Sequence, residues 1–171
     1  DEEELGQLRT AINNHLRANG YYAFSEKYIS FLIDTNLNSN SLNIDLQIAN
    51  PFSRQDDTIV KSTHKPYKIR NIFVYPDYYP VTSAYHKPIT DTVRYFHKPH
   101  KNVRLSRFEF IQSDYNSIKP KPIMRSILLQ NGDLFSPVIA QNTRSALSQL
   151  KNFKFIDISF TPDNNSKADT L

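Results

Sequence analysis

Residues 143–161 read TRSALSQLKNFKFIDISFT, and this stretch decides the fold that the sequence predicts. The apolar spacing up to Leu150 is that of an amphipathic helix, and the residues that follow alternate with the period of a strand. One face of this strand carries Ile156, Ile158 and Phe160, and the other carries Phe155, Asp157 and Ser159. We therefore expect a helix followed almost at once by a strand, Phe153–Thr161, which Pro162 ends.

The same order of elements opens the chain. One helical face within residues 2–18 carries Leu5, Leu8, Ile12 and Leu16, and Asn19-Gly20 is a typical helix stop. Two alternating stretches follow, Tyr28–Asp34 and Leu42–Ile48, which predict an antiparallel hairpin with one buried face. Because a helix-then-strand unit occurs near both ends, the sequence indicates a small α/β module that is used more than once.

The middle of the chain is less regular. Residues 51–65 are polar and lack periodicity, which predicts an exposed linker or long loop, with a domain boundary near residue 60. Residues 68–75 (KIRNIFVY) and 103–111 (VRLSRFEFI) are rich in β-branched and aromatic side chains, and we expect both to be strands. Between them, residues 77–102 form an aromatic and proline-rich excursion to which no element is assigned.

A short helix and a longer one are predicted before the closing strand. The short helix is expected over Ile123–Gln130, with a stop at Asn131-Gly132. Ser136-Pro137 supplies an N-cap and a first-turn proline for the longer helix. The buried stripe of this helix is expected to contain Ile139, Thr143, Ala146, Leu147 and Leu150.

Composition excludes some classes of protein. Of 171 residues, 39% are hydrophobic, which is enough for a folded core, and no apolar run approaches the length of a membrane span. The absence of cysteine excludes disulfides and thiolate metal sites. A chain that starts at Asp1 and has Met124 as its one methionine is expected to be a processed or excised piece of a longer protein.

The net charge of +4 hides an asymmetry. Residues 1–60 hold four basic and nine acidic side chains, whereas residues 61–125 hold thirteen basic and four acidic ones. A basic segment of this kind is compatible with phosphates or an anionic membrane surface, and equally with scattered solvated lysines.

Two stretches carry a resemblance to a known family. IKPKPIMRSILLQNGDLFSPVIAQNTRSALSQLKNFKFIDISF, residues 118–160, has the apolar first helix, the glycine, the second helix with spaced leucines and the alternating strand of a POTRA (polypeptide-transport-associated) domain. LRTAINNHLRANGYYAF, residues 8–24, together with the two strands to Ala49, resembles the second helix and terminal hairpin of a preceding POTRA module.

The resemblance implies an α+β fold of tandem POTRA-like modules (β-α-α-β-β). Residues 1–50 match a module without its first strand and first helix, 51–65 a linker, and 66–171 a second module without its last strand and with an insertion at 77–102. The parent protein would be an outer-membrane assembly or translocation factor of the BamA/TamA kind, in the periplasm and anchored by a C-terminal β-barrel outside this chain. Its partners would be unfolded outer-membrane protein precursors, neighbouring modules and accessory assembly proteins.

Such modules would work through the backbone of their edge strands, which pair with an extended peptide. The resemblance assigns this role to two strands, of which the residues expected to bind are Tyr28, Ile29, Ser30, Phe31, Lys154, Phe155, Ile156, Asp157 and Ile158. The alternative is that these strands close their own sheets or are covered by a neighbouring module.

Side-chain chemistry is sparse. No glycine-rich phosphate loop, nucleophile elbow or zinc-protease helix is found, so no catalytic residue, metal or cofactor is predicted. His86, His97 and His100 lie close in sequence, but they lack the carboxylates of a metal site and are interpreted as loop residues. Arginines interleaved with rings, as in residues 94–98 and 104–110, leave a nucleic-acid-binding module as the alternative function.

Overall fold

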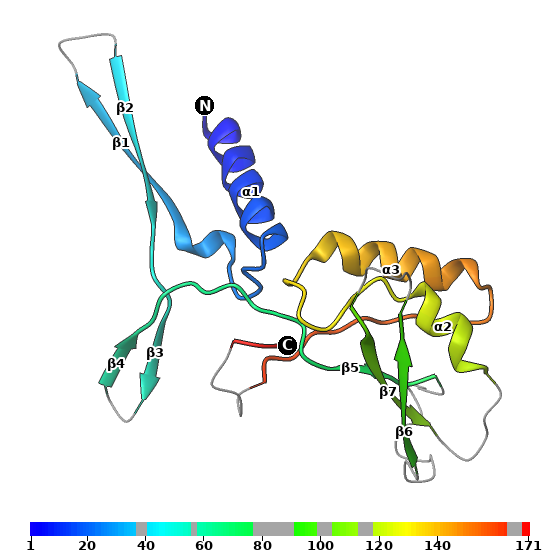
Figure 1. Ribbon diagram of the computed structural model, residues 1–171. Coiled ribbons are helices and arrows are strands. Elements are labelled where there is room, and N and C mark those ends of the chain that lie inside the picture. The colour runs from blue at the N-terminus through cyan, green and yellow to red at the C-terminus, as the bar shows by residue number, and fades with distance from the viewer. Residues whose placement is uncertain (37–40, 56–57, 77–90, 99–103, 113–117, 164–168) are drawn as a thin grey trace. The chain divides into compact units, whose positions relative to one another are not determined.

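The computed structural model describes residues 1–36, 41–55, 58–76, 91–98, 104–112, 118–163 and 169–171 (Figure 1). Within these residues the predicted α+β class is confirmed. The chain divides into two compact units, Asp1–Tyr67 and Lys68–Leu171. The division falls after Tyr67, which is close to the predicted start of the second module at residue 66 and later than the boundary predicted near residue 60.

Helix α1, Glu2–Ala18, opens the first unit and has the predicted ends. Asp1 and Glu4 form a capping box, in which the Glu4 amide donates to the Asp1 carboxylate at 2.8 Å. A hydrogen bond from the Asp1 ammonium group lowers the pKa of the Glu4 carboxyl. The helix stops before Gly20, whose φ of 98° is a conformation that glycine adopts without strain.

A short 3-10 helix, η1 (Glu26–Tyr28), leads into strand β1 (Ile29–Asn36), which pairs antiparallel with β2 (Ser41–Ile48). The predicted hairpin is thus confirmed, with Tyr28 just outside it; residues 37–40 of the predicted connector lie outside the described residues. Its register places Ile29 opposite Ile48 and Ile33 opposite Ile44. The prediction that one face is buried is wrong for most of the hairpin, because the apolar side chains beyond Phe31 remain about half exposed.

The predicted linker, 51–65, contains a second hairpin. Strands β3 (Phe52–Gln55) and β4 (Thr58–Lys61) pair antiparallel, with Phe52 opposite Lys61. Four-residue strands are too short for periodicity to be recognised, although the β-branched run Thr58-Ile59-Val60 favours a strand. This part of the chain is therefore structured and is not a plain loop.

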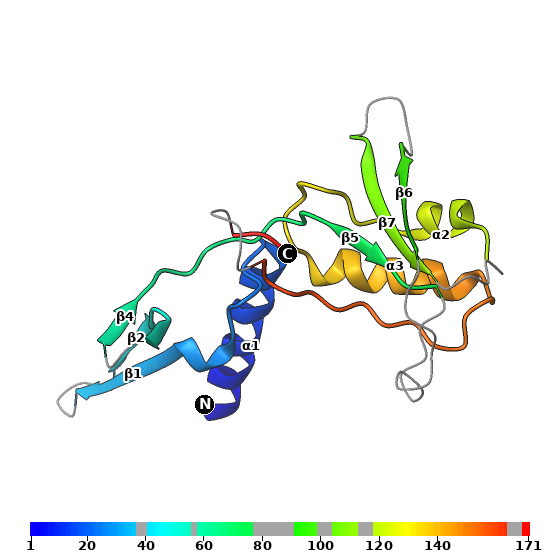
Figure 2. The same ribbon diagram turned by 90° about the horizontal axis from the view of Figure 1, so that it is seen from below.

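The second unit contains a three-stranded sheet in the order β5-β7-β6 (Figure 2). Strand β5 (Ile72–Val74) runs parallel to β7 (Ser106–Gln112), and β6 (Asp91–His97) runs antiparallel to β7. The two predicted strands 68–75 and 103–111 correspond to β5 and β7 with shorter or shifted bounds. Phe108 and Phe110 on β7 are each 1% exposed and form the centre of the core.

Strand β6 corrects the interpretation of residues 77–102 as an excursion without elements. Its seven residues form a ladder with β7 from Asp91 opposite Gln112 to His97 opposite Ser106. Residues 77–90 and 99–102 lie outside the described residues. The run TVRYF has the β-branched and aromatic composition of a strand, but Pro88 and Pro99 on either side concealed it.

Helices α2 (Pro120–Ser126) and α3 (Pro137–Gln149) follow the sheet. Helix α2 starts and ends earlier than predicted, because Pro120 occupies its first turn, where the missing N–H costs nothing. The predicted N-cap is confirmed, since the Ser136 hydroxyl accepts from the Ile139 amide at 3.4 Å. Within the predicted stripe Thr143 is buried, and its hydroxyl accepts from the Leu128 amide at 3.1 Å.

The turn at Asn131-Gly132 joins the helices to the start of the sheet. The Gly132 amide donates to the Ile69 carbonyl at 2.6 Å, and the Ile69 amide donates to the Asp133 backbone carbonyl at 2.8 Å. Gly132 has a φ of 90°, and a Cβ there would stand 2.7 Å from a guanidinium nitrogen of Arg104. The backbone conformation therefore favours glycine at this position, whereas the end of the flexible Arg104 side chain can move aside.

The predicted closing strand, Phe153–Thr161, is not a strand in the structure. Residues 151–162 are assigned no helix or strand, and Lys154 lies at a bend. The chain leaves α3 through Lys151, which has a left-handed φ of 55°. Alternation predicted an extended conformation, but a strand also needs a neighbour within hydrogen-bonding distance, and no described segment pairs with this one.

Candidate functional site

The predicted docking residues of the first unit lie at the base of the β1–β2 hairpin. Tyr28 is the last residue of η1 and not part of β1, and its carbonyl accepts from the Ala49 amide at 2.8 Å. Ile29 is buried, Ser30 is exposed and Phe31 is half-buried. Because β1 and β2 form a two-stranded sheet, the edge of β1 that faces away from β2 pairs with no other described strand.

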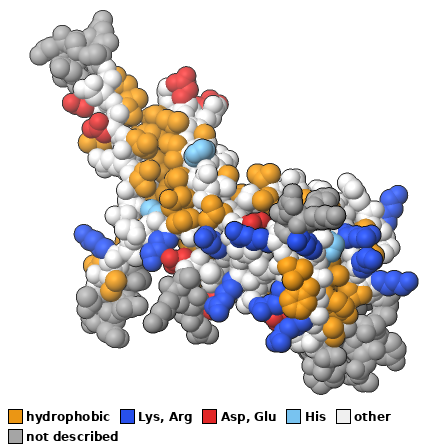
Figure 3. Space-filling model, in the orientation of Figure 1, with side chains coloured by type: hydrophobic (Ala, Val, Ile, Leu, Met, Phe, Trp, Pro, Cys, Tyr) orange, Lys and Arg blue, Asp and Glu red, His pale blue; other side chains and the backbone are white. Residues whose placement is uncertain are grey.

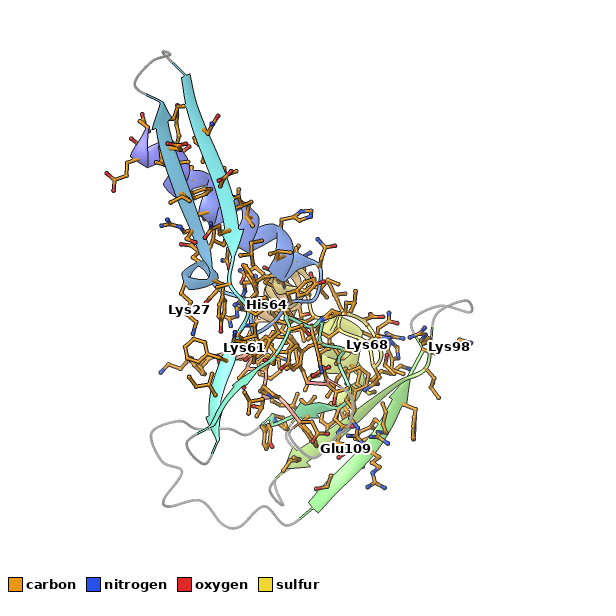
Figure 4. All side chains as sticks on the ribbon, turned by 90° about the vertical axis from the view of Figure 1, so that its left-hand side faces the viewer. Lys27, Lys61, His64, Lys68, Lys98 and Glu109 are labelled. Carbon is orange, nitrogen blue, oxygen red and sulfur yellow. The ribbon has the colours of Figure 1, made fainter. Side chains whose placement is uncertain are left out.

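An aromatic cluster holds this base. Phe24, Tyr28 and His64 pack with ring centroids 4.6 to 5.8 Å apart, and His64 lies near the end of the first unit (Figure 4). His64 Nε2 donates to the Ala49 carbonyl at 2.9 Å. Phe24 is 2% exposed, so the start of the hairpin packs on a buried aromatic cluster.

One face of the hairpin is apolar along its length. Its register aligns seven apolar side chains on this face, namely Ile29, Phe31, Ile33, Leu42, Ile44, Leu46 and Ile48. Helix α1 reaches the base of the face, where the Arg9 guanidinium lies 5.7 Å from the Phe31 ring centroid. Towards the tip the side chains remain 47% to 52% exposed, and Figure 3 shows hydrophobic side chains as a continuous stripe there.

The predicted docking residues of the second unit, Lys154 to Ile158, lie in the extended segment that follows α3. Figures 1 and 2 show this segment returning alongside α3. The predicted alternation is present, because Ile156 and Ile158 are half-buried while Phe155 and Asp157 are exposed. Asp157 forms a long ion pair of 3.9 Å with Arg144 on α3.

The backbone of this segment is unpaired. Residues 153–159 make no backbone hydrogen bond with any other described residue. Its end is anchored by the Phe160 ring, which packs edge-on against Phe135 at 5.0 Å. The segment is therefore an extended chain that follows α3 and is held at its far end by Phe160, and its N–H and C=O groups have no backbone partner among the described residues.

A third open edge was missed by the sequence analysis. Strand β6 lies at the side of its sheet, and no described strand pairs with its outer edge. On the exposed face beside this edge, Arg94 and Arg107 each lie 3.6 Å from Glu109. Phe96 on β6 and Phe73 on β5 are 59% and 50% exposed on the same face. The basic and aromatic side chains at 94–98 are evident in the sequence, whereas the strand that orders them is not.

The described residues form neither a metal-binding cluster nor a membrane-spanning helix. Across the described ranges, no three His, Asp or Glu side chains gather as a metal site requires. His97 ends β6, while His86 and His100 lie outside the described residues. No helix in the part of the chain that the structure describes is long and apolar enough to cross a membrane.

No protein-family model matches the chain, and no curated protein or solved structure is significantly similar to it. The function must therefore be argued from the open edges themselves.

Proposed function

We propose that the chain is a tandem POTRA-like segment of an outer-membrane β-barrel assembly or translocation factor. It would lie in the periplasm and act as a scaffold and docking region for unfolded barrel precursors. The parent protein would be anchored by a β-barrel outside this chain, and would work with neighbouring modules and accessory proteins. Docking would occur by β-augmentation, in which a client segment adds a strand to an open edge.

The order of elements supports this proposal. In the second unit β7 is followed by α2 and α3, which is the strand-helix-helix order of the module, and an extended segment that is not a strand takes the place of the module's next strand. In the first unit α1 is followed by β1 and β2, the order of its second half. Strands β3, β4 and β6 belong to neither pattern and are features of this chain.

The unpaired backbone of residues 153–159 is the observation that carries the proposal. The segment is extended, has a half-buried side and an exposed side, and makes no backbone hydrogen bond to another described residue, so an incoming strand can pair with it. Each backbone hydrogen bond to a guest contributes about 0.5–1.5 kcal/mol, and no particular side chain is required. Such a mechanism tolerates many client sequences.

A proline scan at alternating positions tests the proposal. Successive N–H groups of an extended chain point to opposite edges, so Ile156→Pro and Ile158→Pro remove donors from one edge, and Phe155→Pro and Asp157→Pro from the other. Capture of a fluorescent peptide from an unfolded barrel strand should fall about tenfold for one pair and stay unchanged for its matched control pair. Equal effects of both pairs, in variants whose circular dichroism shows that they remain folded, would refute backbone pairing.

Single-stranded nucleic acid remains the second candidate partner, because exposed rings and arginines share the face of the β5-β7-β6 sheet. No nucleic-acid-binding motif accompanies these side chains in the sequence, so we rank nucleic-acid binding below strand docking. Micromolar or tighter binding of oligonucleotides with a steep dependence on salt would reverse this ranking.

A further inference from the structure

Among the described strands of the second unit, β6 presents an open edge along its whole length. All seven of its residues pair with β7, and no strand of the described chain occupies the other side. The edge belongs to a regular sheet, so a guest strand would extend an existing ladder. This edge differs from the segment 153–159, which has no ladder of its own.

The charge beside this edge is unbalanced. Arg94 on β6 stands directly opposite Glu109 on β7, and Arg107 approaches the same carboxylate, so two guanidinium groups share one negative charge. The Arg94 side chain is 68% exposed and is the member of the group nearest the edge. Figure 4 marks Glu109 on the sheet and Lys98, also exposed, just beyond β6. A carboxylate on an incoming strand would complete this group.

An apolar contact lies two residues further along the same face. Phe96 is 59% exposed and has Arg107 as its partner on β7. Aromatic pairs across strands stabilise a sheet beyond their area of contact. A guest residue opposite Phe96 is therefore best matched by an aromatic ring.

A second copy of this chain fits the edge poorly. Arg94 is the midpoint of Asp91–His97, so symmetric antiparallel pairing of two β6 strands would place Arg94 against its own copy. Like charges directly opposite each other destabilise a sheet. The charge pattern thus favours a different, acidic polypeptide.

We propose that the open edge of β6 captures an acidic extended segment of a client polypeptide. A carboxylate of the client lies opposite Arg94, and an aromatic residue two positions away lies opposite Phe96. In the antiparallel orientation, which is the more stable one, the client reads aromatic-x-acid. This inference rests on the proposed strand docking, but it assigns a separate edge and gives the client a chemical signature.

A charge swap on the full chain tests the assignment. The probe is a short fluorescent peptide of alternating threonine and valine with a central Tyr-x-Asp. Arg94→Glu should weaken its binding at least about tenfold, and a peptide with lysine in place of the aspartate should restore binding to this variant. Arg125→Glu on α2 changes the net charge equally at another exposed arginine and should leave the affinity within about twofold.

Two further measurements separate the outcomes. Arg94→Glu places two carboxylates side by side and this variant could fail to fold. Arg94→Gln is therefore a second variant, and it should also weaken binding of the Tyr-x-Asp peptide. Methylation of the peptide's backbone nitrogens at alternate positions should abolish binding for one set of positions and spare the other. A peptide affinity that neither the charge swap nor the methylation changes would overturn the proposal. Displacement of the peptide by a single-stranded oligonucleotide that binds more tightly would also overturn it.

The proposed function can fail independently. If the prolines at 156 and 158, or those at 155 and 157, reduce capture of barrel peptides while Arg94→Glu changes nothing, the β6 edge is not used and strand docking stands. If the charge swap succeeds while neither proline pair matters, docking occurs at β6 and not at residues 153–159.

Discussion

The β1–β2 hairpin and the segment 153–159 share one sequence pattern and reach different states. Both alternate apolar and polar residues, but β1 has a ladder of eight pairs, whereas residues 153–159 have none. The difference shows that alternation specifies an extended conformation and its two faces. Pairing depends on whether the chain returns to offer a second edge.

Proline in the hairpin should give the largest effect on folding. Of the adjacent residues Ile44 and Asp45, only one has its amide directed at β1. Proline at that residue removes a ladder hydrogen bond in mid-strand and should destabilise the first unit by about 3 kcal/mol. Ile158→Pro is the matched control, because the Ile158 amide has no backbone partner in the described part of the chain, and it should cost less than about 1 kcal/mol. Urea unfolding followed by circular dichroism measures both, and equal losses would contradict the contrast between the two regions.

Removal of the Thr143 hydroxyl should have the next largest effect. Thr143→Val keeps the shape of a side chain that is 1% exposed but leaves the Leu128 amide without its acceptor. We expect a loss of about 2 kcal/mol, because a partly buried donor is left unsatisfied. Hydrogen exchange at the Leu128 amide should accelerate. Unchanged exchange would mean that this bond does not hold α3, from which the unpaired segment starts.

The N-cap of the same helix should contribute less. Ser136→Ala removes the acceptor of the Ile139 amide and should destabilise the second unit by about 1 kcal/mol. Ser136→Asp restores a capping acceptor and should recover most of that loss, as thermal unfolding can show. If the aspartate variant is no more stable than the alanine variant, the cap does not act through its hydrogen bond.

Polar substitution on the open face of the hairpin should give the smallest change. Ile33→Thr and Ile44→Thr replace half-exposed side chains opposite each other and should each cost less than about 1 kcal/mol, because little buried area is lost. They should nevertheless lower the fluorescence of a hydrophobic dye bound to the chain. A stability loss as large as that of the proline variants would indicate that this face is covered.

Sequence analysis recovered local structure where the pattern was long. Helix α1, its glycine stop and the β1–β2 hairpin follow from periodicity over many residues, and Ser136 follows from capping chemistry. The failures have two physical causes. Strands β3 and β4 are too short to show a period, and flanking prolines concealed β6. The missing pairing at residues 153–159 could not be read from the chain, because it depends on the spatial return of other segments.

The candidate sites divide in the same way. Residues 28–31 and 154–158 were selected as docking edges from a family resemblance, and the structure places them at the base of a hairpin and in an unpaired segment. The group of Arg94, Arg107 and Glu109 needed the register of β6 with β7, which brings residues from separate predicted segments onto one face.

The packing of His64 between two aromatic rings has a spectroscopic consequence. Ring currents from Phe24 and Tyr28, whose centroids lie 4.8 and 4.6 Å away, should displace the imidazole proton resonances well away from those of an exposed histidine. With five histidines in the chain, this resonance should stand apart in a proton spectrum. The chemical shift of this one resonance would report whether the aromatic cluster at the base of the hairpin stays packed while a ligand is titrated.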